Sequence, residues 1–140
     1  MRARWIVLVA GAYALALALI ALWPTPVDRN LAVVELPPVA WLLRHVGLDQ
    51  LTGYQLIEFS ANIALFVPLG ILILLWRTDW GWRQATLLSL AVTVTIEVLQ
   101  NLLRPERFAS LSDIVANTAG GLIGALVVLA ARRRVPALRR

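Results

Sequence analysis

Four long apolar runs alternate with shorter polar segments along the chain, and they set its architecture. The runs cover residues 5–23, 59–76, 84–103 and 114–131. Each is long enough to cross the hydrocarbon core of a bilayer as a helix, which takes about 20 residues, or roughly 17 to 25 with tilt. We therefore predict an all-α polytopic membrane protein with four transmembrane helices, built as a single domain over residues 1–140.

The longest connection between these runs, residues 24–57, contains a short amphipathic pattern. A helix near residues 37–47 can begin at Pro37 and Pro38, because proline is favoured in the first turn of a helix. Its apolar side chains then share one face, while Arg44 lies on the other. We predict that this short helix lies in the headgroup region of the membrane.

The composition agrees with a membrane protein and excludes several kinds of chemistry. Hydrophobic residues make up 60% of the chain and the mean hydropathy is +0.77, which is too apolar for an ordinary soluble domain. The chain has no cysteine and no lysine, and His45 is its single histidine. Disulfides, thiol catalysis, Schiff-base lysines and multi-histidine metal sites are therefore excluded. We predict neither a metal centre nor a bound cofactor.

The arginines cluster at the ends of the apolar runs, and their distribution predicts the topology. One side of the membrane would hold Arg2, Arg4, Arg77, Arg83, Arg132, Arg133, Arg134, Arg139 and Arg140. The other side would hold only Arg29, Arg44, Arg104 and Arg107. Because cytoplasmic segments carry the excess of basic residues, we predict that both termini are cytoplasmic. This placement fits membrane topology better than a nucleic-acid footprint, so we expect no nucleic-acid partner.

A polar stripe runs along the helix predicted over residues 84–103. Its members recur at spacings of three and four residues, so they share one helical face: Thr86, Ser89, Thr93, Glu97, Gln100 and Arg104. Asp113 and Asn117 continue this pattern on the following helix, and Glu58 and Asn62 lie one turn apart at the start of the helix over residues 59–76. Because these helices are antiparallel neighbours, their acidic, amide and guanidinium groups lie at the same, outer, end, whereas the inner half of the stripe carries hydroxyls only.

These residues form a candidate pocket for a polar headgroup. An ionisable group near hydrocarbon costs several kcal/mol unless it is paired or reaches water, so such residues usually face a bundle interior and carry function. The predicted ligand-binding residues are Glu58, Asn62, Glu97, Gln100, Arg104, Arg107, Asp113 and Asn117. The two arginines can hold a phosphate or carboxylate. Glu97 and Asp113 are the best candidates for acid–base roles.

A structural interpretation of the same residues stands beside the functional one. Glu97 with Arg104, and Asp113 with Arg107, can form ion pairs that hold the bundle together, and the asparagines can form hydrogen bonds between helices. The segment GGLIG at residues 120–124 is typical of a small-residue packing face.

The motifs in residues 58–126 resemble those of the VanZ-like family of small bacterial membrane proteins. The matching segments are NIALFVPLG from Asn62, EVLQ from Glu97 and RFASLSDIVANTAG from Arg107. The resemblance implies an integral protein of the bacterial plasma membrane, and the founding member of the family is associated with low-level resistance to the glycopeptide teicoplanin. It implies no biochemical mechanism. It supports Asn62, Glu97, Gln100, Arg107, Asp113 and Asn117 as functional positions, whereas Ser110 stands where family members often have another acid.

Three functional hypotheses follow from the residues and the resemblance. The first is a VanZ-like protein with an outward-facing pocket for an amphipathic cell-envelope molecule, such as a membrane lipid, a lipid-linked envelope precursor or a lipoglycopeptide. The second is a membrane enzyme that acts on a lipid-linked phosphate, with carboxylates as metal ligands or as an acid–base pair. The third is a small transporter coupled to protonation of Glu97. The sequence leaves open whether the protein is an enzyme.

Overall fold

A computed structural model describes residues 2–21, 33–103 and 110–134, and these residues are almost entirely helical. The elements are α1 (Arg2–Ala21), the 3₁₀ turn η1 (Val33–Glu35), α2 (Pro37–Val46), α3 (Gln50–Trp76), α4 (Trp82–Leu103) and α5 (Leu111–Arg134). Of these, the four helices α1, α3, α4 and α5 are long and apolar enough to cross a membrane. The predicted all-α, four-span fold is therefore confirmed.

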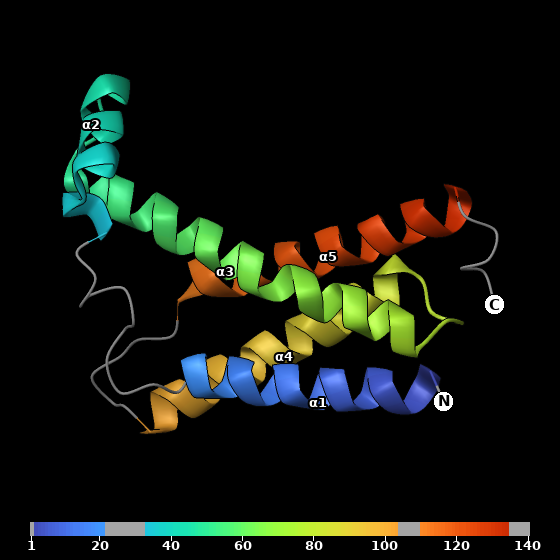
Figure 1. The fold of residues 1–140 in the computed structure, drawn as a ribbon. Coiled ribbons are helices and arrows are strands. Elements are labelled where there is room, and N and C mark those ends of the chain that lie inside the picture. The colour runs from blue at the N-terminus through green and yellow to red at the C-terminus, as the bar shows by residue number, and fades with distance from the viewer. Residues whose placement is uncertain (1, 22–32, 104–109, 135–140) are drawn as a thin grey trace.

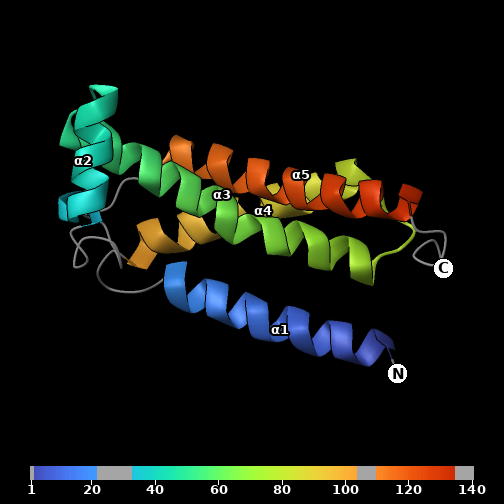
Figure 2. The ribbon, with the colours of Figure 1, turned by 45° about the horizontal axis from the view of Figure 1, so that its top comes forward.

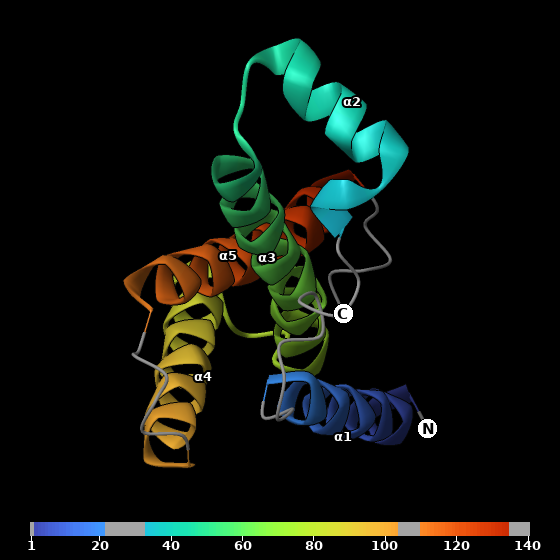
Figure 3. The ribbon, with the colours of Figure 1, turned by 90° about the vertical axis from the view of Figure 1, so that its left-hand side faces the viewer.

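The four long helices lie side by side and alternate in direction (Figures 1 and 2). At one end of the bundle α4 stops and α5 starts, and we call this the junction end. We call the opposite end the arginine end. The short helix α2 projects from the junction end, where it packs on η1 and on the start of α3. Viewed from that end, α3 stands between α5 and α1 (Figure 3).

Glycines bring α3 and α5 into close contact along the most extensive interface of the bundle. A Cβ on Gly70 of α3 would overlap the carbonyl oxygen of Gly121, and a Cβ on Gly124 would overlap that of Val67. Gly120 likewise faces the backbone of α3 at Ile63. Small residues permit such approach between helices in lipid, where no hydrophobic force drives association. The predicted packing face of residues 120–124 is thus confirmed.

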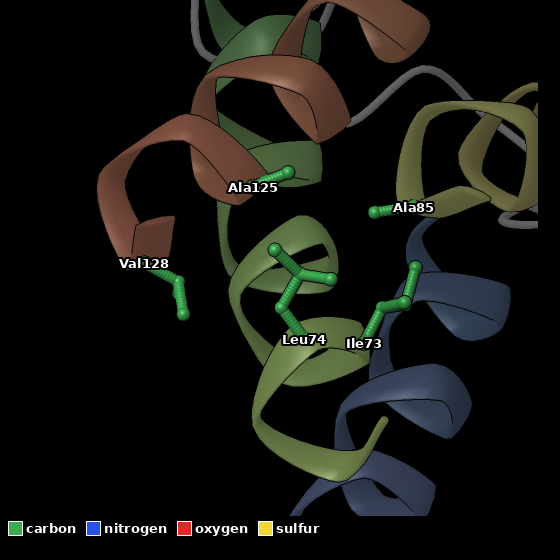
Figure 4. Packing of buried hydrophobic residues seen from close by; sticks show 5 residues of the cluster. All are labelled: Ile73, Leu74, Ala85, Ala125 and Val128. Carbon is green, nitrogen blue, oxygen red and sulfur yellow. The ribbon is translucent and has the colours of Figure 1, made fainter. Parts of the chain in front are cut away.

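An apolar cluster fills the bundle near the arginine end. It consists of Ile73 and Leu74 from α3, Ala85 from α4, and Ala125 and Val128 from α5 (Figure 4). Leu74, Ala85 and Ala125 are completely buried. The described side chains packed against this cluster are also apolar, namely Leu69, Ile71, Trp80, Leu88 and Leu129, and the cluster lies between the arginine end and the polar residues nearer the junction end.

The turn between α3 and α4 carries charged and aromatic side chains at the arginine end. Arg77 donates two hydrogen bonds to the Asp79 carboxylate, at 3.1 and 3.2 Å, and its guanidinium lies 4.8 Å from the ring centre of Trp80. The hydrogen bonds from Arg77 hold the pKa of Asp79 below its ordinary value. Arg132 of α5 donates to the backbone carbonyl oxygens of Leu74 and Thr78, which fixes the end of α3 to α5.

Helix α1 lies at the periphery and is held by few contacts. Leu17 is its one buried apolar side chain among the described residues. The Tyr13 hydroxyl donates to the carbonyl oxygen of Leu65, one turn before Pro68 on α3. A Cβ on Gly11 would meet no atom within 4 Å, so this part of α1 is not closely packed.

The helix predicted over residues 59–76 begins earlier than expected, at Gln50. Asp49 caps it: its carboxylate accepts hydrogen bonds from the backbone N–H of Thr52 at 2.9 Å and from the Thr52 hydroxyl at 2.8 Å. Leu43 of α2 packs on Gly53, which supports these added turns. The short helix predicted near residues 37–47 is present as α2, and it ends at Gly47, whose φ of 74° suits a helix terminus.

Candidate binding site at the junction of α3, α4 and α5

Glu97 connects α4 to the start of α5. Its side chain is only 5% exposed, and its Oε2 accepts a hydrogen bond from the backbone N–H of Ser110 at 2.9 Å. Ser110 in turn caps α5, because its hydroxyl accepts a hydrogen bond from the N–H of Asp113 at 3.2 Å. A helix start has free N–H groups that favour negative charge, so a carboxylate is well placed there.

Asp113 and Asn62 join α5 to α3. The Asn62 amide donates to Asp113 Oδ1 at 3.0 Å. Asp113 lies in the first turn of α5, and its charge also complements the helix dipole. Glu58 lies one turn before Asn62 on α3 and is half-buried. Together with Glu97 and Ser110, these contacts form an outer tier of polar groups that links three helices.

Thr93 and Asn117 form an inner tier, one helical turn further from the junction end. The Asn117 Nδ2 donates to Thr93 Oγ1 at 2.9 Å. Thr93 is fully buried and Asn117 is 6% exposed. Within residues 2–21, 33–103 and 110–134, two buried side-chain oxygens have no hydrogen-bond partner, Asn117 Oδ1 and Thr118 Oγ1. Buried polar atoms are nearly always bonded, so these two call for an explanation.

The polar column ends one turn beyond the inner tier. Ser89 of α4 is fully buried and packs on Gly121 of α5, while its hydroxyl donates back to the carbonyl oxygen of Ala85. Ala85 belongs to the apolar cluster shown in Figure 4. The column therefore runs inward from the junction end for about 12 Å, counted as eight residues from Glu97 to Ser89 at 1.5 Å each. It stops at apolar side chains.

The structure brings several of the predicted site residues together and separates one. Asn62, Glu97, Asp113 and Asn117 all lie in the two tiers. Gln100 instead turns toward α1, where its Nε2 donates to the carbonyl oxygen of Ala21 at 2.6 Å. Arg104 and Arg107, the remaining predicted ligand-binding residues, lie outside the described residues. The binding roles of the set stay a prediction.

Thr93 and Ser110 join the site although neither was among the predicted binding residues. Thr93 lies four residues before Glu97, so helical spacing alone places it on the same face. Ser110 is followed three residues later by Asp113, a pattern that is typical of a helix start. Among the described residues, no group of three or more histidine, cysteine, aspartate or glutamate side chains is arranged to hold a metal ion.

The fold and the site define a small polytopic helical protein whose buried polar side chains converge on one helix junction. The family model VanZ/LLP1 matches residues 10–132, and the chain belongs to this family. The resemblance that the motifs indicate is confirmed by this match. A comparison with curated proteins gives no match, and a comparison with solved structures gives none either.

Proposed function

We propose that this protein binds the polar headgroup of an amphipathic cell-envelope molecule at the junction end. One observation carries the proposal. Among the described residues, the buried polar side chains are Ser89, Thr93, Glu97 and Asn117, and all of them lie on the facing surfaces of α4 and α5. Helices in lipid pack well through small and apolar residues, as α3 and α5 do here, so a buried carboxylate in the neighbouring interface points to function.

The distribution of charge supports an outward-facing site in the plasma membrane. Arg77, Arg83 and the last turn of α5, Arg132 to Arg134, all lie at the arginine end, opposite the junction end. Under the positive-inside rule the arginine end is cytoplasmic and the junction end faces outward. A headgroup in the outer leaflet would then reach the outer tier directly.

The molecule we propose is a lipid-linked envelope precursor, a membrane lipid or a lipoglycopeptide. Each combines an apolar part, which stays in the bilayer, with a polar part that can hydrogen-bond to the carboxylates and amides of the two tiers. The resemblance to a family whose founding member is associated with teicoplanin resistance agrees with a ligand of this kind.

The closed inner end of the column favours binding over transport. A transported ion or solute needs a polar path through the bundle, and here the path ends at the apolar cluster around Ala85 and Ala125. A site whose polar groups gather toward the junction end suits a headgroup whose tail remains in lipid.

The experiment compares acidic residues inside and outside the junction. Glu97→Gln and Asp113→Asn would be expressed in a bacterial host in which the wild-type protein changes susceptibility to teicoplanin. Glu35→Gln is the matched control, because Glu35 is an exposed acid on η1 away from the tiers. We expect the junction variants to lose the change in susceptibility and the control to keep it, with equal amounts of each protein in the membrane. Full retention of the change by both junction variants would refute the proposal.

A further inference from the structure

Asn117 carries a hydrogen-bond acceptor that the described part of the bundle does not use. Its Nδ2 is bonded to Thr93, whereas its Oδ1 is buried and has no partner among the residues that the structure describes. The whole residue is 6% exposed, so bulk water does not solvate this oxygen. In hydrocarbon surroundings an unpaired carbonyl oxygen is strongly unfavourable. The hydrogen bond from Nδ2 to Thr93 accounts for the amide nitrogen of Asn117 but leaves its oxygen unexplained.

The surroundings of this oxygen favour a donor group as its partner. Among the described residues, the outer tier on the junction side includes the carboxylates of Glu97 and Asp113, which are acceptors themselves. Thr118 Oγ1, on the next residue, is also buried and, among the described residues, has no hydrogen-bond partner, so it is not bonded to Asn117. Toward the arginine end the Ser89 hydroxyl already donates to the carbonyl oxygen of Ala85, and the apolar cluster follows. A donor group of a bound molecule therefore has to arrive from the junction end.

We propose that Asn117 Oδ1 accepts a hydrogen bond from a hydroxyl or ammonium group of the bound headgroup. The inner tier is then a subsite that selects headgroups with hydrogen-bond donors over headgroups without them. This inference rests on the proposed function and specifies its ligand class. The headgroup would approach from the junction end between α4 and α5, the helices that the Ser110 N–H to Glu97 hydrogen bond joins.

The test uses three phospholipids that differ in donor groups. Phosphatidylethanolamine has an ammonium donor, phosphatidylglycerol has hydroxyl donors, and phosphatidylcholine has neither. The purified protein is held in nanodiscs of equal parts of the three, and the lipids that remain bound after mild delipidation are counted by native mass spectrometry. We expect one or both donor lipids to be retained roughly tenfold over phosphatidylcholine, the usual worth of one well-placed hydrogen bond. The donor lipid that is retained more strongly identifies the donor group as ammonium or hydroxyl.

Two variants locate the preference. Asn117→Leu removes the free acceptor and should bring retention of the donor lipids down to that of phosphatidylcholine, while thermal stability stays equal or rises. Asn101→Leu is the matched control, because Asn101 is an exposed amide on the same helix end as Glu97, and it should keep the wild-type ratio. If Asn117→Leu does not fold, it is replaced in the test by the double variant Asn117→Leu with Thr93→Val, which removes both partners of the buried hydrogen bond.

The outcomes separate this inference from the proposed function. A folded Asn117→Leu protein with the wild-type lipid ratio overturns the subsite, and so does a wild type that retains all three lipids equally. In either case, if Glu97→Gln still lowers the total number of retained lipids, the junction remains a headgroup site. If Glu97→Gln changes nothing either, both proposals fail.

Discussion

Replacing Gly70 with alanine should loosen the bundle at its tightest contact. The new Cβ would overlap the carbonyl oxygen of Gly121 and lie 2.9 Å from its carbonyl carbon and 3.0 Å from the backbone nitrogen of Ala125. These are backbone atoms, so no side chain can rotate away, and α3 and α5 must separate by on the order of 1 Å to regain normal contact. Overpacking of this kind costs about 1–3 kcal/mol.

The helix propensity of alanine offsets part of this cost, by up to about 1 kcal/mol. We therefore expect Gly70→Ala to lower the free energy of unfolding by about 1–2 kcal/mol. The separation should also stretch the Asn62–Asp113 hydrogen bond, now 3.0 Å, beyond the range of about 3.5 Å. Site function should then fall together with stability.

Gly11→Ala is the control, because the same change at Gly11 meets no atom within 4 Å. We expect it to leave stability unchanged or to raise it by up to about 1 kcal/mol. Both variants would be unfolded by titration with a denaturing detergent in bicelles and followed by circular dichroism. Equal stability of Gly70→Ala and wild type, or equal damage from the two substitutions, would refute the close packing of α3 on α5.

Arg132→Met keeps an unbranched stem but removes the hydrogen bonds to Leu74 and Thr78, so the unfolding free energy in bicelles should fall by about 1–2 kcal/mol; no change would contradict its role in holding α3 to α5. The Asp49 carboxylate has a lowered pKa because it accepts hydrogen bonds from the backbone N–H and the hydroxyl of Thr52. The stability that this cap contributes is therefore present above pH 3.8, the ordinary pKa, and is lost as the pH falls through the lowered pKa of the folded protein. Asp49→Asn should abolish this loss of stability in acid at the start of α3. Amide hydrogen exchange of those turns, compared between the variant and the wild type at each pH, measures it, and the same pH dependence in both proteins would contradict the cap. Because the chain has no cysteine, Ser112→Cys and Thr78→Cys can each be labelled alone: an impermeant maleimide should modify the first in intact cells and the second only after permeabilisation, and the reverse result would place the junction in the cytoplasm.

The sequence predicts the spans of this fold well because length and apolar composition decide them. It misplaces the start of α3 because Gln50, Tyr54 and Glu58 interrupt the apolar pattern there. The Asp49–Thr52 cap and the contact of Leu43 with Gly53 stabilise those turns, and only the cap has a signal in the sequence.

The candidate site is predictable as a set of residues on helix faces but not as a set of pairs. Helical spacing puts Thr93, Glu97 and Gln100 near one another on α4. Their hydrogen-bond partners depend on how far α5 and α1 are shifted along the bundle axis relative to α4. Periodicity within one helix carries no information on that shift. Glu97 thus faces the start of α5, whereas Gln100 reaches the end of α1 at Ala21.

The pairing of α3 with α5 bears on how the protein is made. These helices form the closest interface of the bundle, yet α4 is synthesised between them, so α3 enters the bilayer before the helix that covers Gly70 exists. Glu97 likewise enters the bilayer with α4, before Ser110, its hydrogen-bond donor, has been synthesised. An unfinished chain therefore presents the glycine surface of α3 without its partner helix, and its Glu97 lacks the hydrogen bond from Ser110.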